Sequence, residues 1–508
     1  MFSKLKLQTF LALVLFVSLF SGCKSGFFSG QETSSSLTQN QSSNAAPPAP
    51  IVVDGVRQSY ADVVEKTSPA VVRIDAEHKT KADASAQGNP MFDDPQLREF
   101  FKNLPQQPQQ RRPRVERGVG SGVIVSADGT ILTNYHVVGD AEKITVAMNN
   151  NNTFAAKVVG SDQPSDLAVL KIESENLPFL NLGNSDNVRI GDIVLAIGNP
   201  LGIGQTVTAG IISAKGRRTG LSDGSFEDFL QTDAPINQGN SGGALVSLSG
   251  ELIGINSQIL SGAQGGGNIG IGFSIPSNMA KSVMEQLVEN GKVRRGRLGV
   301  VLQPITDAIA EQFEVKDKKG VLINQIQTGS AAEKAGIKRG DVIVAINGER
   351  VEDPNTLRNK VAGTLPGTEI KVTVLRDGKE QDFTAKLDEL ETENAKAENP
   401  NGDERKDGDN SSQNGKLGLS LQPTTPELLK QLRLPADTKG LIVSEVDESG
   451  AAAEEGVERG DVILEINKKP VGTIDDVQSA LTQAGDRPVL LLISRKGRTV
   501  YLTVTPGK

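Results

Sequence analysis

An internal repeat near the C-terminus limits the folds that this chain can adopt. The segment from Gly329 to Ile343 recurs from Ser449 to Ile463, so that Gly340 and Gly460 occupy equivalent places 120 residues apart. Each copy ends in Gly-Asp-Val-Ile, a pattern typical of a helix followed by a strand. The repeat predicts two copies of one small domain. We expect them at residues 292–390 and 415–508.

The segment between the two copies, residues 391–414, is charged, rich in Asn, Gly and Ser, and almost devoid of large apolar side chains. Such a composition cannot bury a core, so we expect a linker. The chain has 508 residues, too many for one hydrophobic core, and this length indicates about three domains. Its net charge of −8 argues against a general nucleic-acid binder, and we expect no nucleic acid among its partners.

The N-terminus has the order of an export signal. Lys4 and Lys6 precede an apolar run from Phe10 to Phe20, and Ser21-Gly22-Cys23 follows this run. The run is shorter than the roughly 20 residues that span a bilayer, which argues against a permanent anchor. Cys23 is the only cysteine, so a disulfide within one chain is excluded.

A thiol directly after Ser-Gly resembles the lipobox of bacterial lipoproteins. We therefore expect an export signal at 1–22 and lipidation of Cys23, with a plain cleaved signal as the alternative. The following residues are rich in Ser, Gln, Asn and Pro and predict a flexible tether at 23–55. A lipid on Cys23 would anchor the folded body to a membrane, and we expect the protein in the periplasm or cell envelope.

From residue 56 the pattern changes to short apolar runs separated by Asp-Gly, Gly-Asp and Asn-Pro turns. This spacing favours a mainly β structure, one barrel or a pair of barrels, over residues 56–291. Only Ser277 to Glu289 has helical spacing, with Ser277 as the expected N-cap and Gly291 as the stop. A polar, proline-rich insert between Ala76 and Arg117 is expected to be functional or disordered. The apolar runs lie at residues 70–74, 122–125, 129–133, 143–148, 167–172, 193–197 and 252–255.

Ser241, in the sequence Gly239-Asn240-Ser241-Gly242-Gly243, is a candidate nucleophile. A serine hydroxyl is a poor nucleophile at neutral pH, so it needs a general base and a site for the oxyanion. Glycine adopts turns that other residues avoid, which lets the N–H groups of Gly239 and Ser241 point at one place. We therefore expect an oxyanion hole at Gly239, Asn240 and Ser241. The alternative is an ordinary turn between two strands.

The chain contains only two histidines, which limits the candidates for the base. His78 lies in a charged stretch and is expected in a solvated loop, whereas His136 ends an apolar, strand-like run and is the candidate base or a core histidine. Asp166 precedes the apolar run 167–172 and can orient an imidazole, with Asp162 in the preceding turn as the second candidate. The order His136, Asp166, Ser241 is the order found in chymotrypsin-like double barrels.

These motifs resemble the bacterial HtrA/Deg (Do-like) family of periplasmic serine proteases. The resemblance runs from about Tyr60 to Lys508 and is carried by residues 133–138, 165–169, 239–245 and 268–276. It implies a chymotrypsin-like double β-barrel protease domain followed by two small α+β PDZ domains. It also implies that Ser241 attacks the peptide carbonyl, that His136 transfers the proton and that Asp166 holds the imidazole tautomer.

The resemblance further assigns the substrate pocket to Ile236, Ile269 and Ile271. Because these side chains bring no carboxylate, we expect cleavage after small or medium aliphatic residues. The resemblance also implies a homotrimer or a multiple of trimers, and PDZ carboxylate-binding loops whose N–H groups bind the C-terminal peptides of unfolded substrates. The two loops are Arg297, Leu298, Gly299 and Val300 in the first copy, and Lys416, Leu417, Gly418 and Leu419 in the second.

Two functions remain open. The first is an ATP-independent serine endopeptidase that degrades misfolded or unfolded proteins in the cell envelope. No GxxxxGK[ST] phosphate loop occurs, so its substrates should already be unfolded. The second is an envelope chaperone (holdase) or a PDZ scaffold with little proteolysis. Two histidines and one cysteine cannot form a usual zinc site, so we expect no metal and no cofactor.

Overall fold

The computed structural model describes residues 52–53, 56–57, 59–79, 115–199, 204–219, 226–237, 239–261, 267–391, 416–431 and 438–507. The predicted export signal, Cys23 and most of the tether lie outside the described residues, as do nearly all of the linker and the centre of the insert. At the end of the predicted tether, Val52–Val53 (β1) pairs antiparallel with Val56–Arg57 (β2), so this part forms a short hairpin.

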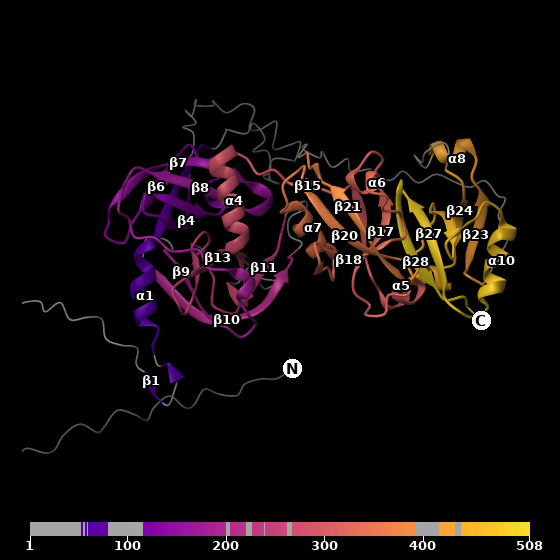
Figure 1. The fold of residues 1–508 in the computed structure, drawn as a ribbon, viewed down its shortest axis with the longest axis horizontal. Helices are drawn as coiled ribbons and strands as arrows, with labels where there is room; N and C mark the ends of the chain where they lie inside the picture. The colour runs from indigo at the N-terminus through magenta and orange to yellow at the C-terminus, as the bar shows by residue number, and fades with distance from the viewer. Residues whose placement is uncertain are drawn as a thin grey trace, which may run out of the picture. The chain divides into compact units, whose positions relative to one another are not determined.

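Six antiparallel strands close into a first barrel, coloured indigo to purple in Figure 1. Their order around the barrel is β3-β4-β5-β8-β7-β6. Alternate residues of a strand face the interior, and Ile74, Ile124, Leu132 and Leu170 are fully buried there. The strands are β3 (Val71–Lys79), β4 (Val115–Ser126), β5 (Thr130–Thr133), β6 (Lys143–Ala147), β7 (Thr153–Asp162) and β8 (Leu167–Ile172).

A second barrel of six strands follows, in the order β10-β11-β14-β13-β12-β9. Val194, Ile212, Leu230 and Leu245 belong to its buried core. Two closed barrels confirm the predicted double-barrel fold. The strands are β9 (Ile193–Gly198), β10 (Thr206–Arg217), β11 (Phe229–Thr232), β12 (Ala244–Ser247), β13 (Leu252–Ser261) and β14 (Asn268–Pro276).

Helix α4 (Ser277–Asn290) packs against both barrels, contacting β7 and β8 of the first and β13 of the second (Figure 1). The predicted N-cap was wrong by one residue. Pro276 occupies the cap position, and Ser277 is the first helical residue, whose buried hydroxyl donates to the carbonyl of Gly183 at 2.7 Å. Gly291, with φ of 69°, ends the helix as predicted.

Strands β3 and β4 are longer than the sequence suggested. The predicted insert began at Ala76 and ended at Arg117, but residues 76–79 continue β3 and residues 115–117 begin β4. The expectation that His78 lies in a solvated loop was also wrong, because His78 lies in β3. Polar residues are accommodated here because β3 pairs with strands on both sides, β4 and β6, which satisfies its backbone.

The two C-terminal repeats form two sheets with the same plan, which confirms the predicted pair of α+β PDZ domains. The strand orders are β16-β17-β18-β20-β21 and β23-β24-β25-β27-β28. Each repeat also has the same ion pair. Arg376 binds the buried Asp341 in the first, and Arg495 binds the buried Asp461 in the second, each with a closest contact of 2.7 Å.

The strands of the first sheet are β16 (Val300–Pro304), β17 (Val321–Ile326), β18 (Val342–Ile346), β19 (Glu349–Arg350), β20 (Glu369–Arg376) and β21 (Lys379–Lys386), and β15 (Gly296–Arg297) pairs with β22 (Asp388–Glu389). The strands of the second are β23 (Leu419–Pro423), β24 (Leu441–Val446), β25 (Val462–Ile466), β26 (Lys469–Pro470), β27 (Val489–Arg495) and β28 (Arg498–Val504). The remaining α-helices are α1 (Ala61–Thr67), α3 (Tyr135–Val138), α5 (Asp307–Gln312), α6 (Ala331–Lys334), α7 (Pro354–Ala362), α8 (Pro426–Gln431), α9 (Ala451–Glu454) and α10 (Ile474–Ala484).

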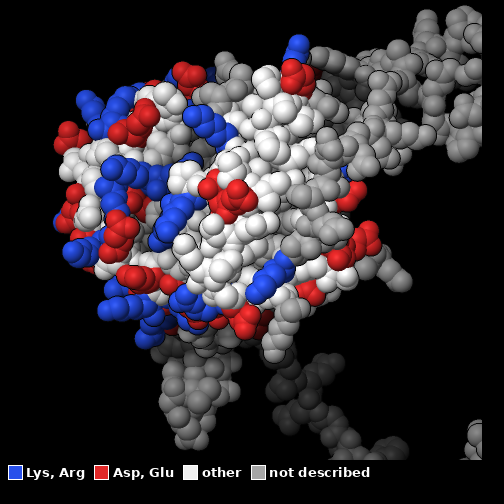
Figure 2. Space-filling model, turned by 90° about the vertical axis from the view of Figure 1, so that its right-hand side faces the viewer, with Lys and Arg blue, Asp and Glu red and all other residues white. Residues whose placement is uncertain are grey.

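No helix within the described ranges is both long enough and apolar enough to span a membrane. On the face drawn in Figure 2, Lys and Arg side chains are interspersed with Asp and Glu side chains.

Candidate active site

Ser241 lies in the turn that leads into β12. Gly239 and Gly242 on either side of it have φ values of 97° and 81°, which only glycine adopts readily. An added Cβ at Gly242 would lie 2.1 Å from the carbonyl oxygen of Ser121, so no larger residue fits there. The Ser241 hydroxyl donates to the carbonyl of Ser257 at 3.0 Å.

His136 and Asp166 are brought together at the rim of the first barrel. His136 lies in the short helix α3, which directly follows β5, so the expectation that it ends a strand was wrong. Its Nδ1 lies 3.0 and 2.9 Å from Oδ1 and Oδ2 of Asp166, and its backbone N–H donates to Oδ1 at 3.0 Å. A carboxylate only accepts hydrogen bonds, so Nδ1 carries a proton, and in the neutral imidazole Nε2 has the lone pair. The imidazole is thereby prepared to accept a proton at Nε2.

The backbone holds Asp166 in a left-handed conformation, with φ of 54°, immediately before β8. Its carbonyl accepts hydrogen bonds from the backbone N–H of Tyr135 and from Nδ2 of Asn134, at 3.1 and 3.0 Å. The residue is thus fixed to the segment that carries His136 by both its backbone and its side chain.

Ser257 on β13 is a site residue that the sequence did not reveal. Its hydroxyl donates to Oδ2 of Asp166 at 2.8 Å, and its carbonyl accepts from Ser241. Ser257 therefore connects the nucleophile candidate to the carboxylate. It reaches the site because β13 pairs with β12, the strand that follows Ser241. A serine within an apolar run gives no indication of such a contact.

The other candidates lie elsewhere. Asp162 caps the turn before Asp166, accepting from the backbone N–H of Ser165 at 3.0 Å, and pairs with Arg295. His78 partly covers Gly118 of β4, since an added Cβ on that glycine would lie 3.4 Å from its Nε2. Neither residue bonds to His136 among the described contacts.

The predicted substrate-pocket residues lie in and beside β14. Ile236 is buried at 1% exposure, and an added Cβ at Gly272 would lie 2.9 Å from its Cδ1. Nδ2 of Asn268 donates to the carbonyl of Ile236 at 2.8 Å and so ties the two segments together. Ile271 is partly buried, whereas Ile269 is 57% exposed. The three isoleucine side chains thus differ in burial, from fully buried Ile236 through Ile271 to exposed Ile269.

The two predicted carboxylate-binding loops have the same geometry. Gly299 and Gly418 have φ of 77° and 72°, and their carbonyls accept from the N–H of Gln327 and Asp447, each at 2.9 Å. Beside the first loop, a groove of about 300 Å³ lies against α7. Arg297 lines this groove, and its Nε is buried without a hydrogen-bond partner among the described residues.

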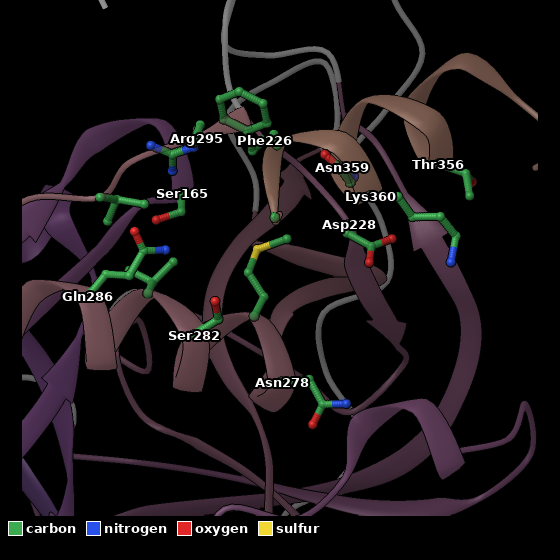
Figure 3. Close-up of a pocket in the computed structure, with 15 residues that line it drawn as sticks. Ser165, Phe226, Asp228, Asn278, Ser282, Gln286, Arg295, Thr356, Asn359 and Lys360 are labelled. Atoms are coloured by element: carbon green, nitrogen blue, oxygen red, sulfur yellow. The ribbon is translucent and has the colours of Figure 1, made fainter. Parts of the chain in front are cut away.

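A pocket of about 400 Å³ lies between α4 and α7 (Figure 3). Phe226 in its wall is flanked by the guanidinium groups of Arg295 and Arg358, each 4.5 Å from the ring centroid. Asp228 also lines the pocket, and burial, reinforced by the nearby Asp186 and Asp353, raises its pKa to about 6. The described residues contain no group of three or more His, Cys, Asp and Glu side chains that could hold a metal ion.

Comparison with known families agrees with this architecture. Residues 120–255 match the trypsin-like peptidase domain, and residues 296–387 and 442–495 each match the PDZ domain. The first match contains His136, Asp166 and Ser241.

Relatives resemble the chain over most of its length. A protein of Chlamydia trachomatis named as a DegP-like periplasmic serine endoprotease is 43% identical over 87% of this chain and 87% of its own. A protein of Haemophilus influenzae named as a do/HhoA-like periplasmic serine protease is 40% identical over 88% of this chain and 92% of its own.

Solved structures of an HtrA-type protease, AlgW, are also similar. The structure with a tripeptide is 40% identical, with a TM-score of 0.53, and covers 66% of this chain and 99% of its own. The structure with a decapeptide is 41% identical, with a TM-score of 0.51, and covers 66% of this chain and 100% of its own. The chain is therefore a trypsin-like serine endopeptidase with two PDZ domains and belongs to the HtrA/Deg family.

Proposed function

We propose that this chain is an ATP-independent endopeptidase of the periplasm that degrades unfolded or misfolded proteins, with Ser241, His136 and Asp166 as its catalytic triad. The observation that carries the proposal is the two-oxygen contact of Asp166 with Nδ1 of His136. This contact leaves Nε2 as the base. In the reaction, Ser241 attacks the peptide carbonyl, His136 takes its proton and donates it to the leaving amine, and Asp166 stabilises the imidazolium.

The serine hydroxyl must turn for this reaction. In the structure it donates to Ser257 rather than to His136. Rotation about one side-chain bond redirects it, since staggered rotamers of serine interconvert readily. The N–H groups of Gly239 and Ser241 have no hydrogen-bond partner among the described residues, which supports their binding the oxyanion. The prediction that Asn240 belongs to the oxyanion hole was wrong for its N–H group, which donates to the carbonyl of Asn237 at 3.0 Å.

We propose that Ile236, Ile269 and Ile271 line the substrate pocket, and their aliphatic side chains support cleavage after small or medium aliphatic residues. Sequencing of cleavage products tests this specificity. A preference for cleavage after Lys or Arg would contradict it, because a buried cation needs a carboxylate partner.

We propose that the PDZ domains, at 292–390 and 415–508, bind the C-termini of substrates. A peptide would add a strand beside β16 in the first groove, and the N–H groups of the Arg297–Val300 loop would bind its carboxylate. The buried, unpartnered Nε of Arg297 supports an anionic ligand. The loop at Lys416–Leu419 repeats this geometry in the second domain.

An exposed aliphatic cluster supports oligomer formation, and we propose a homotrimer or a multiple of trimers. Ile193 and Ile211 face each other across β9 and β10, and they are 39% and 38% exposed. Ile190 nearby is 66% exposed. Light scattering of Ile193→Asp should show a smaller assembly than the wild type, whereas Val288→Asp, at a 55% exposed position on α4, should not change it. Equal masses for all three proteins would contradict this interface.

The names of the relatives support a periplasmic location, and Cys23 supports a lipid anchor to the membrane. Metabolic labelling with a radioactive fatty acid tests the anchor, with Cys23→Ser as the unlabelled control.

The central test is degradation of an unfolded model protein by the mature chain, beside Ser241→Ala, without nucleotide and with a chelator present. Loss of substrate with the wild type alone is expected. If neither protein cleaves the substrate but both suppress its aggregation, the chaperone function replaces the endopeptidase.

A further inference from the structure

Ser121 on β4 lies directly behind the turn that carries Ser241. The residue is fully buried, and each of its polar atoms has a partner. Its backbone N–H donates to the carbonyl of Ser241 at 2.8 Å, and its own carbonyl accepts from the hydroxyl of Thr133 at 2.7 Å. The first of these contacts joins the two barrels, the second lies within the first barrel, and the hydroxyl is left for another role.

The hydroxyl of Ser121 bonds to two separate loops of the second barrel. It accepts from the backbone N–H of Asn199 at 2.8 Å and donates to the carbonyl of Gly239 at 2.6 Å. Because the N–H of Asn199 can only donate, it occupies a lone pair of the serine oxygen. The hydroxyl proton is therefore directed to Gly239.

Asn199 is itself held in place by a chain of amides. Its Nδ2 donates to Oδ1 of Asn149 at 3.3 Å, and Nδ2 of Asn149 donates to Oε1 of Gln205 at 2.7 Å. Nε2 of Gln205 donates to the carbonyl of Ser68 at 2.6 Å. These bonds hold Asn199, whose backbone N–H in turn holds the Ser121 hydroxyl from the side opposite Gly239.

The carbonyl of Gly239 belongs to the peptide unit between the two N–H groups of the proposed oxyanion hole. At the other end of this unit, the N–H of Asn240 donates to the carbonyl of Asn237 at 3.0 Å. A peptide unit is planar, so holding its oxygen and its N–H fixes its orientation. This orientation sets the directions of the chain on both sides, and hence those of the Gly239 and Ser241 N–H groups.

Without the Ser121 hydroxyl, the carbonyl of Gly239 would be a buried acceptor without a partner. Such a group is unfavourable, and the glycine on which it lies, with φ of 97°, can rotate to find another donor. Rotation would turn the flanking N–H groups away from a common point.

We propose that Ser121 is a positioning residue of this peptidase, whose hydroxyl holds the Gly239–Asn240 peptide unit so that the oxyanion hole is formed. The inference rests on the proposed function, because it assigns Ser121 a part in the same reaction. Ser121 does not touch the substrate, and its effect is exerted through Gly239.

The test compares Ser121→Ala with Ser277→Ala, using a fluorogenic peptide as substrate and a peptide boronate as inhibitor. Ser277, the first residue of α4, is a matched control. Its buried hydroxyl also donates to a glycine carbonyl, that of Gly183, at 2.7 Å. Removal of one direct oxyanion donor lowers kcat by about 100- to 1000-fold, so an indirect effect of about 10- to 100-fold is expected for Ser121→Ala. KM should stay within about threefold, because the ground-state substrate makes weaker use of the oxyanion hole.

The affinity for the boronate, whose tetrahedral adduct places an oxygen in the oxyanion hole, should fall by the same factor as kcat. Ser277→Ala should keep both values while losing a comparable amount of thermal stability. Ser121→Cys, which keeps the side-chain volume and a weak donor, should give an intermediate kcat. A crystal structure of Ser121→Ala should show the Gly239–Asn240 peptide unit rotated.

Wild-type kcat and boronate affinity in Ser121→Ala would overturn the inference and leave the proposed function intact. A loss of kcat no larger than that of Ser277→Ala would also overturn it. If the wild-type chain shows no hydrolysis, or if hydrolysis persists in Ser241→Ala, the proposed function is overturned, and the inference with it.

Discussion

The carboxylate of Asp162 forms a buried, two-point ion pair with the guanidinium of Arg295. The contacts are 2.9 Å from Nη1 to Oδ1 and 2.5 Å from Nη2 to Oδ2, and both side chains are less than a tenth exposed. Asp162 belongs to the end of β7, four residues before Asp166, whereas Arg295 directly precedes β15, which pairs with β22 beside the first PDZ sheet. The pair thus joins the turn beside the candidate active site to the beginning of the next domain.

Arg295→Ala should destabilise the chain strongly, because it leaves the Asp162 carboxylate buried without its partner. Breaking a buried pair in this way costs about 3–5 kcal/mol. For a domain of this size, the change corresponds to a loss of roughly 10 °C or more in Tm, measured by scanning calorimetry.

The neighbouring Arg294 provides the control. It pairs with Glu389 at 2.7 Å, but the two side chains are 45% and 41% exposed. Water screens an exposed pair, which therefore contributes little to stability, so Arg294→Ala should change Tm little. Equal losses of Tm in Arg295→Ala and Arg294→Ala would contradict the expectation that the buried pair stabilises the chain more than the exposed pair.

Ser257→Ala should lower the catalytic rate without changing the fold. Its hydroxyl donates to a charged oxygen of Asp166, and such a bond contributes about 1.5–3 kcal/mol. If this stabilisation acts in the transition state, kcat should fall by about 10- to 100-fold. Ser274→Ala, which removes a buried hydroxyl bonded to Oδ1 of Asn256 at 2.9 Å, should keep its kcat. An unchanged kcat in Ser257→Ala would mean that His136 alone holds the carboxylate.

The strands that could be predicted from the sequence are those with short, continuous apolar runs. Residues 167–172 show this well, because five of the six residues of β8 are buried. Strand β7 was missed because most of its residues are exposed or partly exposed and its apolar side chains do not alternate clearly. Its pairing with the neighbouring strands β6 and β8 on both sides, which the pattern within residues 153–162 does not record, determines it instead.

The residues of the candidate site likewise differ in whether the sequence predicts them. The sequence indicated His136, Asp166 and Ser241 because each lies in a distinctive local pattern and their order is informative. Ser257 and Ser121 act through contacts across strands that are 91 and 118 residues apart in sequence from their partners Asp166 and Gly239. No local pattern records such contacts. The choice between Asp162 and Asp166 likewise needed the structure, in which Asp162 pairs with Arg295 and Asp166 contacts His136.

Gly242→Ala should abolish activity and prevent normal folding of the Ser241 turn. Its Cβ would lie 2.1 Å from the carbonyl oxygen of Ser121 and 2.4 Å from the hydroxyl of Thr133, both on buried strands that cannot move apart cheaply. Gly250 has nearly the same φ, 82° against 81°, but its nearest neighbours are side-chain atoms of Lys66 and Thr67 at 3.4 Å.

Gly250→Ala therefore shares the conformational cost, about 1–2 kcal/mol, without the clash. It should lose a few degrees in Tm and keep its peptidase activity. The measurements are Tm and peptide hydrolysis for both variants. Activity in Gly242→Ala comparable to that in Gly250→Ala would show that the close packing behind Ser241 is not required.

Asp228 should make the stability of the chain depend on pH. Its pKa is raised from 3.8 to about 6, first by burial and then by Asp186 and Asp353, while Lys215 and Lys360 oppose the shift. A carboxyl group whose pKa is higher in the folded state favours folding while it is protonated. This contribution is fully present below pH 3.8 and is lost as the pH rises through about 6.

The shift corresponds to about 3 kcal/mol at 1.36 kcal/mol for each pKa unit. Asp228→Asn, which stays neutral, should therefore unfold at a higher temperature than the wild type at pH 7.5, and the difference should shrink towards pH 4. Asp140→Asn, at an exposed position, should follow the wild type at both pH values. Calorimetry at several pH values measures these differences. A constant difference between Asp228→Asn and the wild type would mean that Asp228 does not titrate in this interval, and that its carboxylate is stabilised by the pocket rather than disfavoured.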